Sequence, residues 1–216
     1  MTRVVGFGAG GHARVVIEII QSLQDYEIVG LLDAQPSLKG TLFSGVPVLG
    51  DDTLIESLLA QGIRHAFIGL GTIGNTDPRL KLFERVSRAG FDLVSVMHPN
   101  AIVSPSVTFG VGPTVMAGAV INANTEVGDN VIVNTGAIVE HDCSIGDHSH
   151  ISTGARLAGG VRIGRATHVG IGAVIRQGIQ VGDDAIIAAG AVVVNDIQSG
   201  ETVMGVPAKV QSKVNH

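Results

Sequence analysis

A six-residue period dominates the second half of the chain. Every sixth residue from Met97 to Val193 is apolar, and the residues four positions later are mostly small or slim, as at Ala119, Ala137 and Ala155. A hexad of this kind forms one face of a triangular coil with its large aliphatic side chain inward, so three hexads, about 18 residues, complete a turn and stack on the next. The period therefore predicts a solenoid of parallel β-strands, although it does not fix the handedness of the coil.

The first half follows a different pattern, in which strands, turns and helices alternate. The segment RVVGFG precedes the helical pattern GHARVVIEIIQSL and then EIVGLLD, and HAFIGLG is followed by DPRLKLFERVSRAG and FDLVSV. This alternation is typical of βαβ units around a parallel sheet. We therefore expect a Rossmann-like α/β domain over residues 1–96 and an all-β solenoid with a C-terminal tail over residues 97–216.

Charge and composition limit the partners of the chain. The formal net charge is −5 and no Lys/Arg run occurs, which argues against a nucleic-acid partner. Cys143 is the only cysteine, so we expect no internal disulfide and a cytoplasmic location. The sequence contains no apolar segment long enough to suggest membrane insertion. The mean hydropathy of +0.39 favours an oligomer that buries part of its surface.

Two segments of the solenoid are specific enough to suggest a family. The run VGDNVIVNTGAIVEHDCSIGDHSHISTGARLAGGVRIG and the ending MGVPAKV resemble the hexapeptide-repeat acyltransferases. Together with the leading GFGAGGHARVV and the two-part layout, they make the chain similar to the NeuD/PglD/PerB group of sugar acetyltransferases. The resemblance implies a left-handed parallel β-helix, a homotrimer with intersubunit active sites, acetyl-CoA along the β-helix, and an N-terminal domain that binds the nucleotide of a sugar donor.

The same resemblance implies that His141, in the segment EHDC, is the catalytic base. Acetyl transfer needs a base with a pKa near neutrality to deprotonate the acceptor, and histidine has one. Glu140 and Asp142 flank His141, and either carboxylate could hold the imidazole. Similarity to the family favours Asp142. The alternative is that His141 is an exposed coil residue without a catalytic role.

Further candidates for the acetyl-transfer site lie in neighbouring hexads. The resemblance places His150 near the acetyl group; half a coil separates it from His141, so the two should share a site only across a trimer interface. Its alternative role is a hydrogen bond that stabilises a turn. A backbone N–H of Gly159 or Gly160 could stabilise the oxyanion, although both could be plain corner glycines. Asn134 could contact the acceptor or be a ladder residue.

Three more solenoid residues bear on the chemistry. We expect Ala173, a small residue of the repeat, and Lys209, in the ending VMGVPAKV, to belong to the acetyl-CoA site. Lys209 could meet a CoA phosphate, or it could be an ordinary solvated lysine. Cys143 occupies a slim inward position and should be inert, so no acyl-enzyme is expected.

A glycine-rich loop marks the candidate nucleotide site of the first domain. Gly8, Gly10 and Gly11 lie between a predicted strand and a predicted helix, where backbone N–H groups favour a phosphate. His12 stands where the helix begins. The loop matches the dinucleotide fingerprint only in part, so a nucleotide-sugar diphosphate is favoured over NAD. Asp33 ends the second strand and could reach a ribose or a base edge, or serve only as a turn residue.

A second loop could close over the same ligand. The segment GLGTIGN follows the third predicted strand, and we include its Gly71 and Asn75 in the substrate site. The alternative is a flexible turn.

A metal site is a rival interpretation of the solenoid histidines. His150 and His168 should stack one coil apart, with His148 nearby, and γ-carbonic anhydrases also use trimeric solenoids with interfacial histidines. We nevertheless expect no metal.

The prediction for function is an acetyl-CoA-dependent N-acetyltransferase that acts on a nucleotide-linked amino sugar, of the UDP- or GDP-4-amino-sugar type, in surface-polysaccharide or glycan biosynthesis. O-acetylation of sialic acid or a related saccharide is the alternative, since no residue in the sequence separates an amine from a hydroxyl acceptor. A metal-dependent protein of the γ-carbonic anhydrase kind and a non-catalytic nucleotide-sugar binding protein are the other classes considered.

Overall fold

The computed structural model describes residues 1–211, and the chain divides into two compact units. The first contains Met1–Thr72 and Pro78–Pro99, and the second contains Ile73–Asp77 and the chain from Asn100 onward. The single domain boundary that the sequence predicts after residue 96 would have left Ile73–Asp77 in the first unit. This segment belongs to the second because it packs on the solenoid, where the Thr76 hydroxyl donates to the Ala166 carbonyl oxygen at 3.1 Å.

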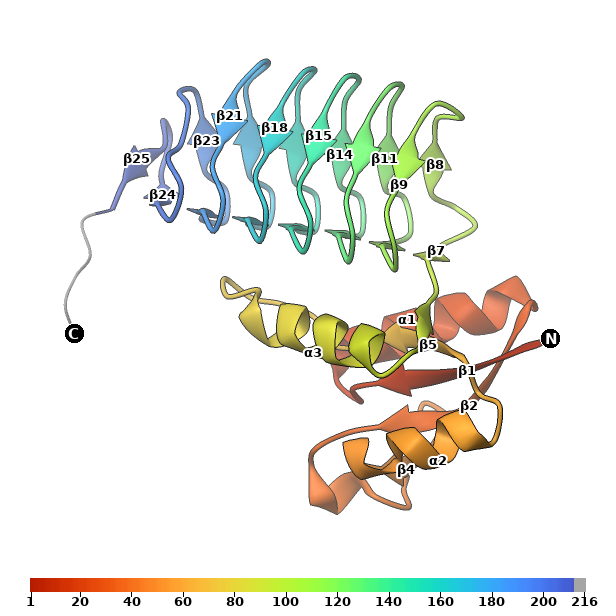
Figure 1. Cartoon of the computed structure of the whole chain (residues 1–216). Helices are drawn as coiled ribbons and strands as arrows, with labels where there is room; N and C mark the ends of the chain where they lie inside the picture. The colour runs from red at the N-terminus through yellow and green to blue at the C-terminus, as the bar shows by residue number, and fades with distance from the viewer. Residues whose placement is uncertain (212–216) are drawn as a thin grey trace. The chain divides into compact units, whose positions relative to one another are not determined.

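The first unit is built on a six-stranded sheet in the order β3-β4-β2-β1-β5-β6 (Figure 1). All neighbours are parallel except the short edge pair β3 and β4. The strands and helices are β1 (Thr2–Phe7), α1 (Gly11–Leu23), β2 (Tyr26–Leu32), β3 (Leu42–Phe43), β4 (Val46–Gly50), α2 (Ile55–Ala60), β5 (His65–Ile68), α3 (Asp77–Arg88) and β6 (Asp92–Leu93), with short 3₁₀ turns at Pro36–Leu38 and Asp52–Leu54. The predicted α/β domain is confirmed.

The central strands of this sheet are apolar because helices cover both faces. In β1 the last four residues are all buried, and the aromatic ring of Phe7 packs edge-on against Phe91 at 5.6 Å between centroids. Phe83 and Val86 of α3 belong to the same core cluster. A parallel sheet buried on both faces needs such continuous apolar runs.

A buried arginine fixes the loop that follows β5. Arg79 of α3 is 1% exposed, and its guanidinium donates to the carbonyl oxygens of Ile68 at 3.1 Å and Leu70 at 2.7 Å. Burial lowers its pKa to about 9. These bonds satisfy carbonyl groups that the end of the strand leaves without a ladder partner.

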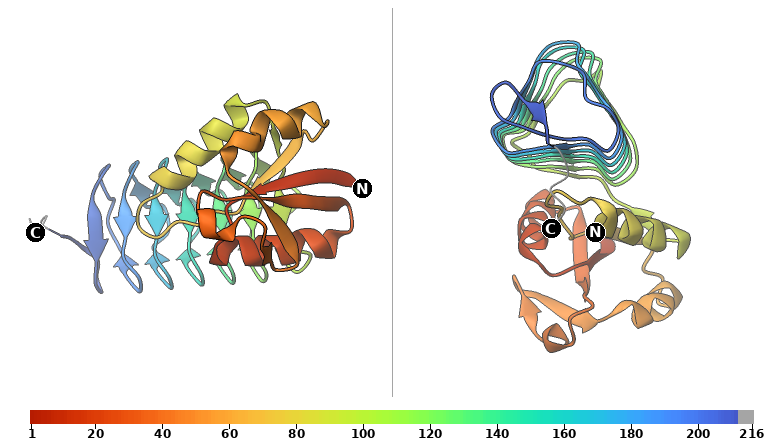
Figure 2. Two further views of the ribbon diagram at one scale, coloured as in Figure 1. Left: turned by 90° about the horizontal axis from the view of Figure 1, so that it is seen from below. Right: turned by 90° about the vertical axis from the view of Figure 1, so that its left-hand side faces the viewer.

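The second unit is a solenoid of short strands in three sheets. Viewed along its axis it has the predicted triangular outline (Figure 2, right). The first solenoid sheet contains β7, β10, β13, β16, β19, β22, β24 and β25, the second contains β8, β11, β14, β17, β20 and β23, and the third contains β9, β12, β15, β18 and β21. Apart from the antiparallel end strand β25, these strands pair in parallel. This arrangement is typical of a left-handed β-helix.

The strands of the first solenoid sheet are β7 (Val96–Met97), β10 (Thr114–Val115), β13 (Ile132–Val133), β16 (His150–Ile151), β19 (His168–Val169), β22 (Ile186–Ile187), β24 (Thr202–Met204) and β25 (Lys209–Val210). Those of the second are β8 (Ile102–Val103), β11 (Val120–Ile121), β14 (Ile138–Val139), β17 (Arg156–Leu157), β20 (Val174–Ile175) and β23 (Val192–Val193). Those of the third are β9 (Thr108–Phe109), β12 (Glu126–Val127), β15 (Ser144–Ile145), β18 (Arg162–Ile163) and β21 (Gln180–Val181).

The six-residue period places one aliphatic side chain per strand inside the coil. Val133, Ile151, Val169 and Ile187 stack in successive coils and are 0% exposed. Cys143 also points inward, as predicted: it is 2% exposed, its Sγ contacts the Ala158 carbonyl oxygen at 3.4 Å, and burial raises the pKa of its thiol. It is therefore not an activated nucleophile. Across residues 1–211, none of the helices has the length and apolar character needed to cross a membrane.

Candidate functional site

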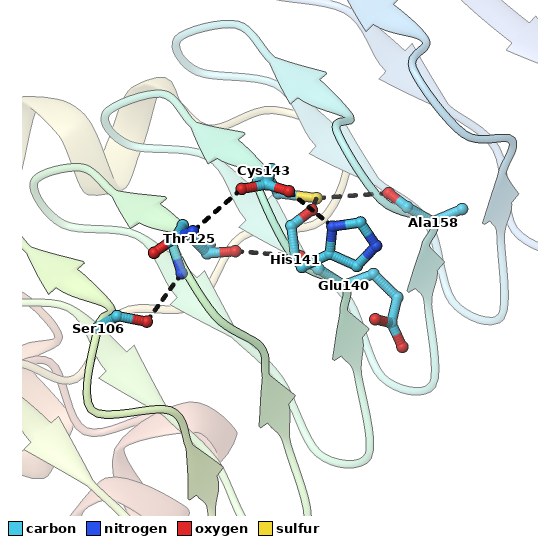
Figure 3. Close-up of polar contacts among 8 residues, drawn as sticks. Ser106, Thr125, Glu140, His141, Cys143 and Ala158 are labelled. Carbon is cyan, nitrogen blue, oxygen red and sulfur yellow. Dashed lines mark hydrogen bonds and ion pairs between the residues drawn. The ribbon is translucent and has the colours of Figure 1, made fainter.

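The corner after β14 carries the predicted catalytic histidine. Asp142 takes a left-handed backbone conformation there, with φ of 60°, and turns the chain toward β15. Asn124, one coil earlier, has φ of 58°, and Gly160, one coil later, has φ of 69°. Asp, Asn and Gly tolerate this conformation best, which explains the residue types in this column. The turn leaves His141 exposed at the edge between the second and third solenoid sheets (Figure 3).

A short polar chain orients the imidazole. His141 Nδ1 lies 2.7 Å from Asp142 Oδ2, and the other carboxylate oxygen of Asp142 accepts a hydrogen bond from Asn124 Nδ2 at 3.3 Å. The Asn124 N–H in turn donates to Ser106 Oγ at 3.0 Å. Because a carboxylate can only accept, Nδ1 of neutral His141 carries the proton and Nε2 is left with a lone pair. Three stacked coils thus hold one imidazole in the tautomer of a base.

The charges around His141 favour its protonated form. The hydrogen bond that His141 donates to Asp142 raises the pKa of His141. Desolvation opposes this effect without cancelling it, and the negative charges of Asp142 and Glu140 raise the pKa further. The same contact with His141, helped by Asn124, lowers the pKa of Asp142. Both side chains are more than half exposed, so solvent screens the pair. A histidine whose basicity is increased in this way is a suitable general base near neutral pH.

Gly159 leaves the space that the imidazole occupies. A Cβ atom added at Gly159 would lie 2.7 Å from Cε1 and 2.8 Å from Nε2 of His141, closer than real Cβ atoms approach. The N–H of the next residue, Gly160, already donates to the His141 carbonyl oxygen at 2.9 Å. The Gly160 N–H is therefore already engaged in a hydrogen bond of the solenoid. Of the two glycines, Gly159 is the one that lies beside the base.

A second polar cluster lies on the first solenoid sheet. His150 is buried at 6% exposure, and its Nε2 lies 3.1 Å from Asn134 Nδ2. The rings of His150 and His168 meet edge to face with centroids 5.2 Å apart, which confirms the predicted stacking. His168 Nε2 lies 3.5 Å from Ser152 Oγ, and burial lowers the pKa of His168. Asn134, a candidate acceptor contact, thus touches His150, and His141 and His150 belong to different faces of the coil.

The third histidine of the rival metal site makes its own contact. His148 Nδ1 lies 3.1 Å from Asn130 Nδ2 of the preceding coil. Within the described part of the chain, no group of three or more His, Cys, Asp or Glu side chains is placed to hold a metal ion.

The first unit has a cavity of about 490 Å³ near the carboxyl ends of its strands. Gly8 and Asp33, two of the predicted substrate residues, line it. Asp33 has a structural function there, since Oδ2 accepts from the Ala9 N–H at 2.7 Å and Oδ1 accepts from the Gln35 N–H at 2.8 Å. The carboxylate thus ties the glycine-rich loop to the end of β2. Ligands of open parallel sheets bind at this edge.

The remaining predicted substrate residues lie outside this cavity lining. A Cβ added at Gly10 or Gly11 would meet nothing within 4 Å, so these glycines face open space in front of α1. A Cβ at Gly71 would lie 3.0 Å from the Cβ of His12, so these two residues pack together. Asn75 belongs to the second unit, and its Oδ1 accepts from the Asp77 N–H at 2.9 Å at the start of α3.

Two families of known proteins match the chain. Residues 3–86 match the PglD N-terminal domain, and residues 124–159 match the bacterial transferase hexapeptide repeat. A crystal structure of PerB from Caulobacter crescentus in complex with CoA and GDP-perosamine is 42% identical, covers 97% of each chain and has a TM-score of 0.88. The acetyltransferase domain of PglB from Neisseria gonorrhoeae is 39% identical, with 98% of this chain and 100% of that one covered and a TM-score of 0.88.

The chain belongs to the PerB/PglB/PglD-type sugar N-acetyltransferase family.

Other relatives extend this assignment. The UDP-N-acetylbacillosamine N-acetyltransferase of Bacillus subtilis (strain 168) is 34% identical over 120 residues, which are 54% of this chain and about half, 52%, of that curated relative. The Neisseria domain has also been solved with acetyl coenzyme A, and the Caulobacter enzyme with one histidine replaced by Asn or by Ala. A family of sugar N-acetyltransferases agrees with the N-acetyl prediction over the O-acetyl alternative.

Sequence reasoning missed several polar groups that the family's fold brings to the first-unit cavity. Lys81 and Arg85 of α3 line it, and Arg85 forms an ion pair of 2.5 Å with Asp52, which also lines it. Their spacing of one helical turn was the available signal, because it puts both cations on one face of the helix.

Two predicted acetyl-CoA residues stand differently in the structure. The Ala173 side chain is 0% exposed and fills a corner of the coil, so only its backbone could contact a ligand. Small inward residues are required at this hexad position, which is why composition alone could not tell packing from binding. Lys209 lies in the exposed end strand β25.

Proposed function

We propose that the protein transfers the acetyl group of acetyl-CoA directly to the amine of a nucleotide-linked amino sugar, with His141 as general base. The observation that carries this proposal is the His141–Asp142 pair at 2.7 Å, exposed at a solenoid corner in a chain of this family. In this pair Nδ1 of His141 carries the proton, the pKa of His141 is raised, and Nε2 is accessible to the amine. A general base requires these three properties.

The reaction needs one proton to move twice. As the sugar amine attacks the thioester carbonyl carbon, His141 Nε2 takes a proton from the amine nitrogen. The tetrahedral intermediate then expels CoA thiolate, and the imidazolium returns the proton to the sulfur, giving the amide and CoA-SH. Asp142 stabilises the imidazolium between these steps without taking the proton. No acyl-enzyme forms, in agreement with a buried Cys143 whose pKa is raised.

The oxyanion of the intermediate needs a donor beside the base. Gly159 lies against the His141 ring, and its lack of a side chain lets a thioester approach its backbone. We assign the oxyanion contact to the Gly159 N–H, and we assign His150 and exposed Lys209 to the acetyl-CoA site.

The nucleotide belongs to the first unit in this proposal. Its cavity of about 490 Å³ is of the size that holds small-molecule ligands, and Lys81 lines it beside the Arg85–Asp52 ion pair, so Lys81 is the cation proposed for the diphosphate. The Caulobacter structure contains GDP-perosamine, and the Bacillus relative is a UDP-N-acetylbacillosamine N-acetyltransferase. GDP- and UDP-linked 4-amino sugars are therefore the proposed acceptors of the acetyl group.

We further propose that the solenoids assemble as a homotrimer. The outer row of the second solenoid sheet is largely apolar, with Ile102 at 66% and Val174 at 37% exposure. Its members are Ile102, Val120, Ile138, Arg156, Val174 and Val192. The equivalent row of the third sheet is polar, with Thr108, Glu126, Ser144, Arg162 and Gln180. Arg156 interrupts this row, but an otherwise apolar row on the outside of a coil is typical of a buried interface.

Sedimentation velocity tests the assembly. The wild type should sediment as a trimer and Val120→Asp as smaller species, because the new carboxylate would be buried between Ile102 and Ile138 without a partner. Gln180→Asp, on the polar row, should stay trimeric. A monomeric wild type would contradict the proposal.

Both co-substrates are cytoplasmic metabolites, so we place the enzyme in the cytoplasm. Acetyl-CoA is the proposed co-substrate, and no metal takes part.

Release of CoA tests the activity itself. We would supply acetyl-CoA with GDP-perosamine, a UDP-linked 4-amino sugar, the corresponding 4-hydroxy nucleotide sugars and free sialic acid. Turnover is expected with a 4-amino nucleotide sugar and absent with its 4-hydroxy counterpart. Turnover only with sialic acid would overturn the N-acetyl proposal, and turnover with none of them would overturn the substrate class. Activity that disappears with a chelator would contradict metal-free chemistry.

A further inference from the structure

The contacts of Asn134 determine which nitrogen of His150 carries a proton. The Thr135 N–H donates to Asn134 Oδ1 at 2.7 Å. A backbone N–H can only donate, so the atom that faces it must be the amide oxygen, and the orientation of the Asn134 amide is settled. Its Nδ2 group therefore points at His150.

The consequence for His150 follows from donor and acceptor balance. Asn134 Nδ2 is a donor only, and it lies 3.1 Å from His150 Nε2. Nε2 must accept this bond, so the proton of the neutral ring is on Nδ1. Protonation of Nε2 would set two N–H donors against each other in a place where His150 is only 6% exposed.

Burial also disfavours a charge on the ring packed against His150. His168 stacks edge to face on His150, and burial lowers its pKa. A second charge beside His150 is therefore disfavoured. His150 and His141 share the tautomer with the proton on Nδ1, but His150 is held through Nε2 by an amide, whereas His141 is held through Nδ1 by a carboxylate.

We propose that Asn134 is a positioning residue that fixes His150 as the neutral tautomer with its proton on Nδ1, so that His150 serves acetyl-CoA as a hydrogen-bond donor and cannot serve as a second base through Nε2. Asn134 acts through His150 in this proposal and does not contact the acceptor sugar. The statement about acetyl-CoA rests on the proposed function, whereas the tautomer is a property of the chain alone.

Nitrogen NMR of the imidazoles reads the tautomer directly. In ¹⁵N-histidine-labelled protein, the His150 signals, assigned as those missing from His150→Gln, should show a protonated Nδ1 and an unprotonated Nε2. In Asn134→Asp a carboxylate oxygen faces Nε2 while the other still accepts from Thr135, so Nε2 should become protonated. A wild-type Nε2 that carries the proton, or an Nε2 that stays unprotonated in Asn134→Asp, would overturn the proposal.

A matched control and a milder variant keep this test decisive. Asn122 occupies the same hexad position, one residue after an inward Ile121, and has the same half-buried exposure. Asn122→Asp should leave the His150 signals unchanged. If Asn134→Asp does not fold, Asn134→Ala removes the donor, and the His150 shifts should become averages of both tautomers. Signals in Asn134→Ala identical to those of the wild type would overturn the role of Asn134.

Kinetics separate the positioning role from a purely structural one. Loss of one donor bond should raise the acetyl-CoA KM of Asn134→Asp by about tenfold, with kcat and the amino-sugar KM changed by less than about threefold. A changed amino-sugar KM with an unchanged acetyl-CoA KM would return Asn134 to the acceptor site and refute the proposal. If the wild type fails to bind acetyl-CoA, the proposed function fails, while the NMR result still decides the tautomer.

Discussion

His141 and His150 lie half a coil apart in the same solenoid, but their surroundings differ in every respect that controls proton transfer. His141 stands at an exposed corner, and a carboxylate raises its pKa. His150 lies buried in a strand, and an amide N–H₂ and a second imidazole contact it. The sequence presents two similar histidines, and in both the proton is placed on Nδ1, but the fold leaves Nε2 of His141 exposed and engages Nε2 of His150 with an amide. Partner and exposure, rather than residue type, set the role of each.

The largest expected effect separates the two histidines by rate. His141→Asn removes the lone pair at Nε2, and kcat should fall by about 10³-fold, while the dissociation constant for acetyl-CoA stays within about twofold. Single-turnover CoA release and calorimetry measure these two quantities. A drop of less than about tenfold would mean that another group is the base, and His150 would then be the first alternative.

The next effect concerns the space beside the base. In Gly159→Ala the new Cβ would collide with the His141 ring, and a displaced base should lower kcat by about 100-fold. The control is the same substitution in the His141→Asn background. If the collision with the imidazole is the cause, most of the loss from Gly159→Ala disappears there, because the two changes affect one interaction. Fully additive losses would instead favour a direct role for the Gly159 backbone.

The third effect appears in the pH dependence. His141 acts when unprotonated, so kcat/KM rises with pH through its pKa, which lies above the ordinary value of 6.5. Asp142→Asn removes the main cause of the raised pKa, so the rise in kcat/KM should move to lower pH, and the plateau rate should fall by about 30-fold. Glu140→Gln should move it less in the same direction, since Glu140 acts only through its charge. A shift of the Asp142→Asn profile to higher pH would contradict this account.

The smallest effect tests His150 as a donor. His150→Gln should raise the acetyl-CoA KM by about tenfold, with little change in kcat or in the pH profile. If the rise of kcat/KM with pH disappeared in His150→Gln, the roles of the two histidines would be reversed.

The period was sufficient to predict a triangular solenoid, whereas its left-handedness was predicted only from the family resemblance. An apolar residue at every sixth position from Met97 onward admits few structures, because each such side chain must be buried by a neighbouring coil. The same repeat placed His150 beside His168 and turned Cys143 inward, since residues one coil apart stack. It also put Gly159 in the column of His141, although the close approach of the imidazole depends on side-chain geometry that spacing does not give.

Other parts of the candidate site were not predictable from pattern. Asn134 and His150 lie on neighbouring coils out of column, and the direction of the amide depends on the Thr135 N–H. Lys81 and Arg85 reach the first-unit cavity only because of where α3 packs. Asp33 was predicted to bind substrate, and the structure adds that both of its oxygens hold backbone N–H groups. Such details arise from tertiary packing, which local sequence does not encode.

One measurement tests the central claim most directly: the pH dependence of kcat/KM for CoA release with a 4-amino nucleotide sugar, in the wild type and in His141→Asn. The account predicts a wild-type profile that rises through a single ionisation above the ordinary histidine value, and a variant profile that is lower by about 10³-fold and lacks this rise. A variant that retains the same rise would show that the titrating base is not His141.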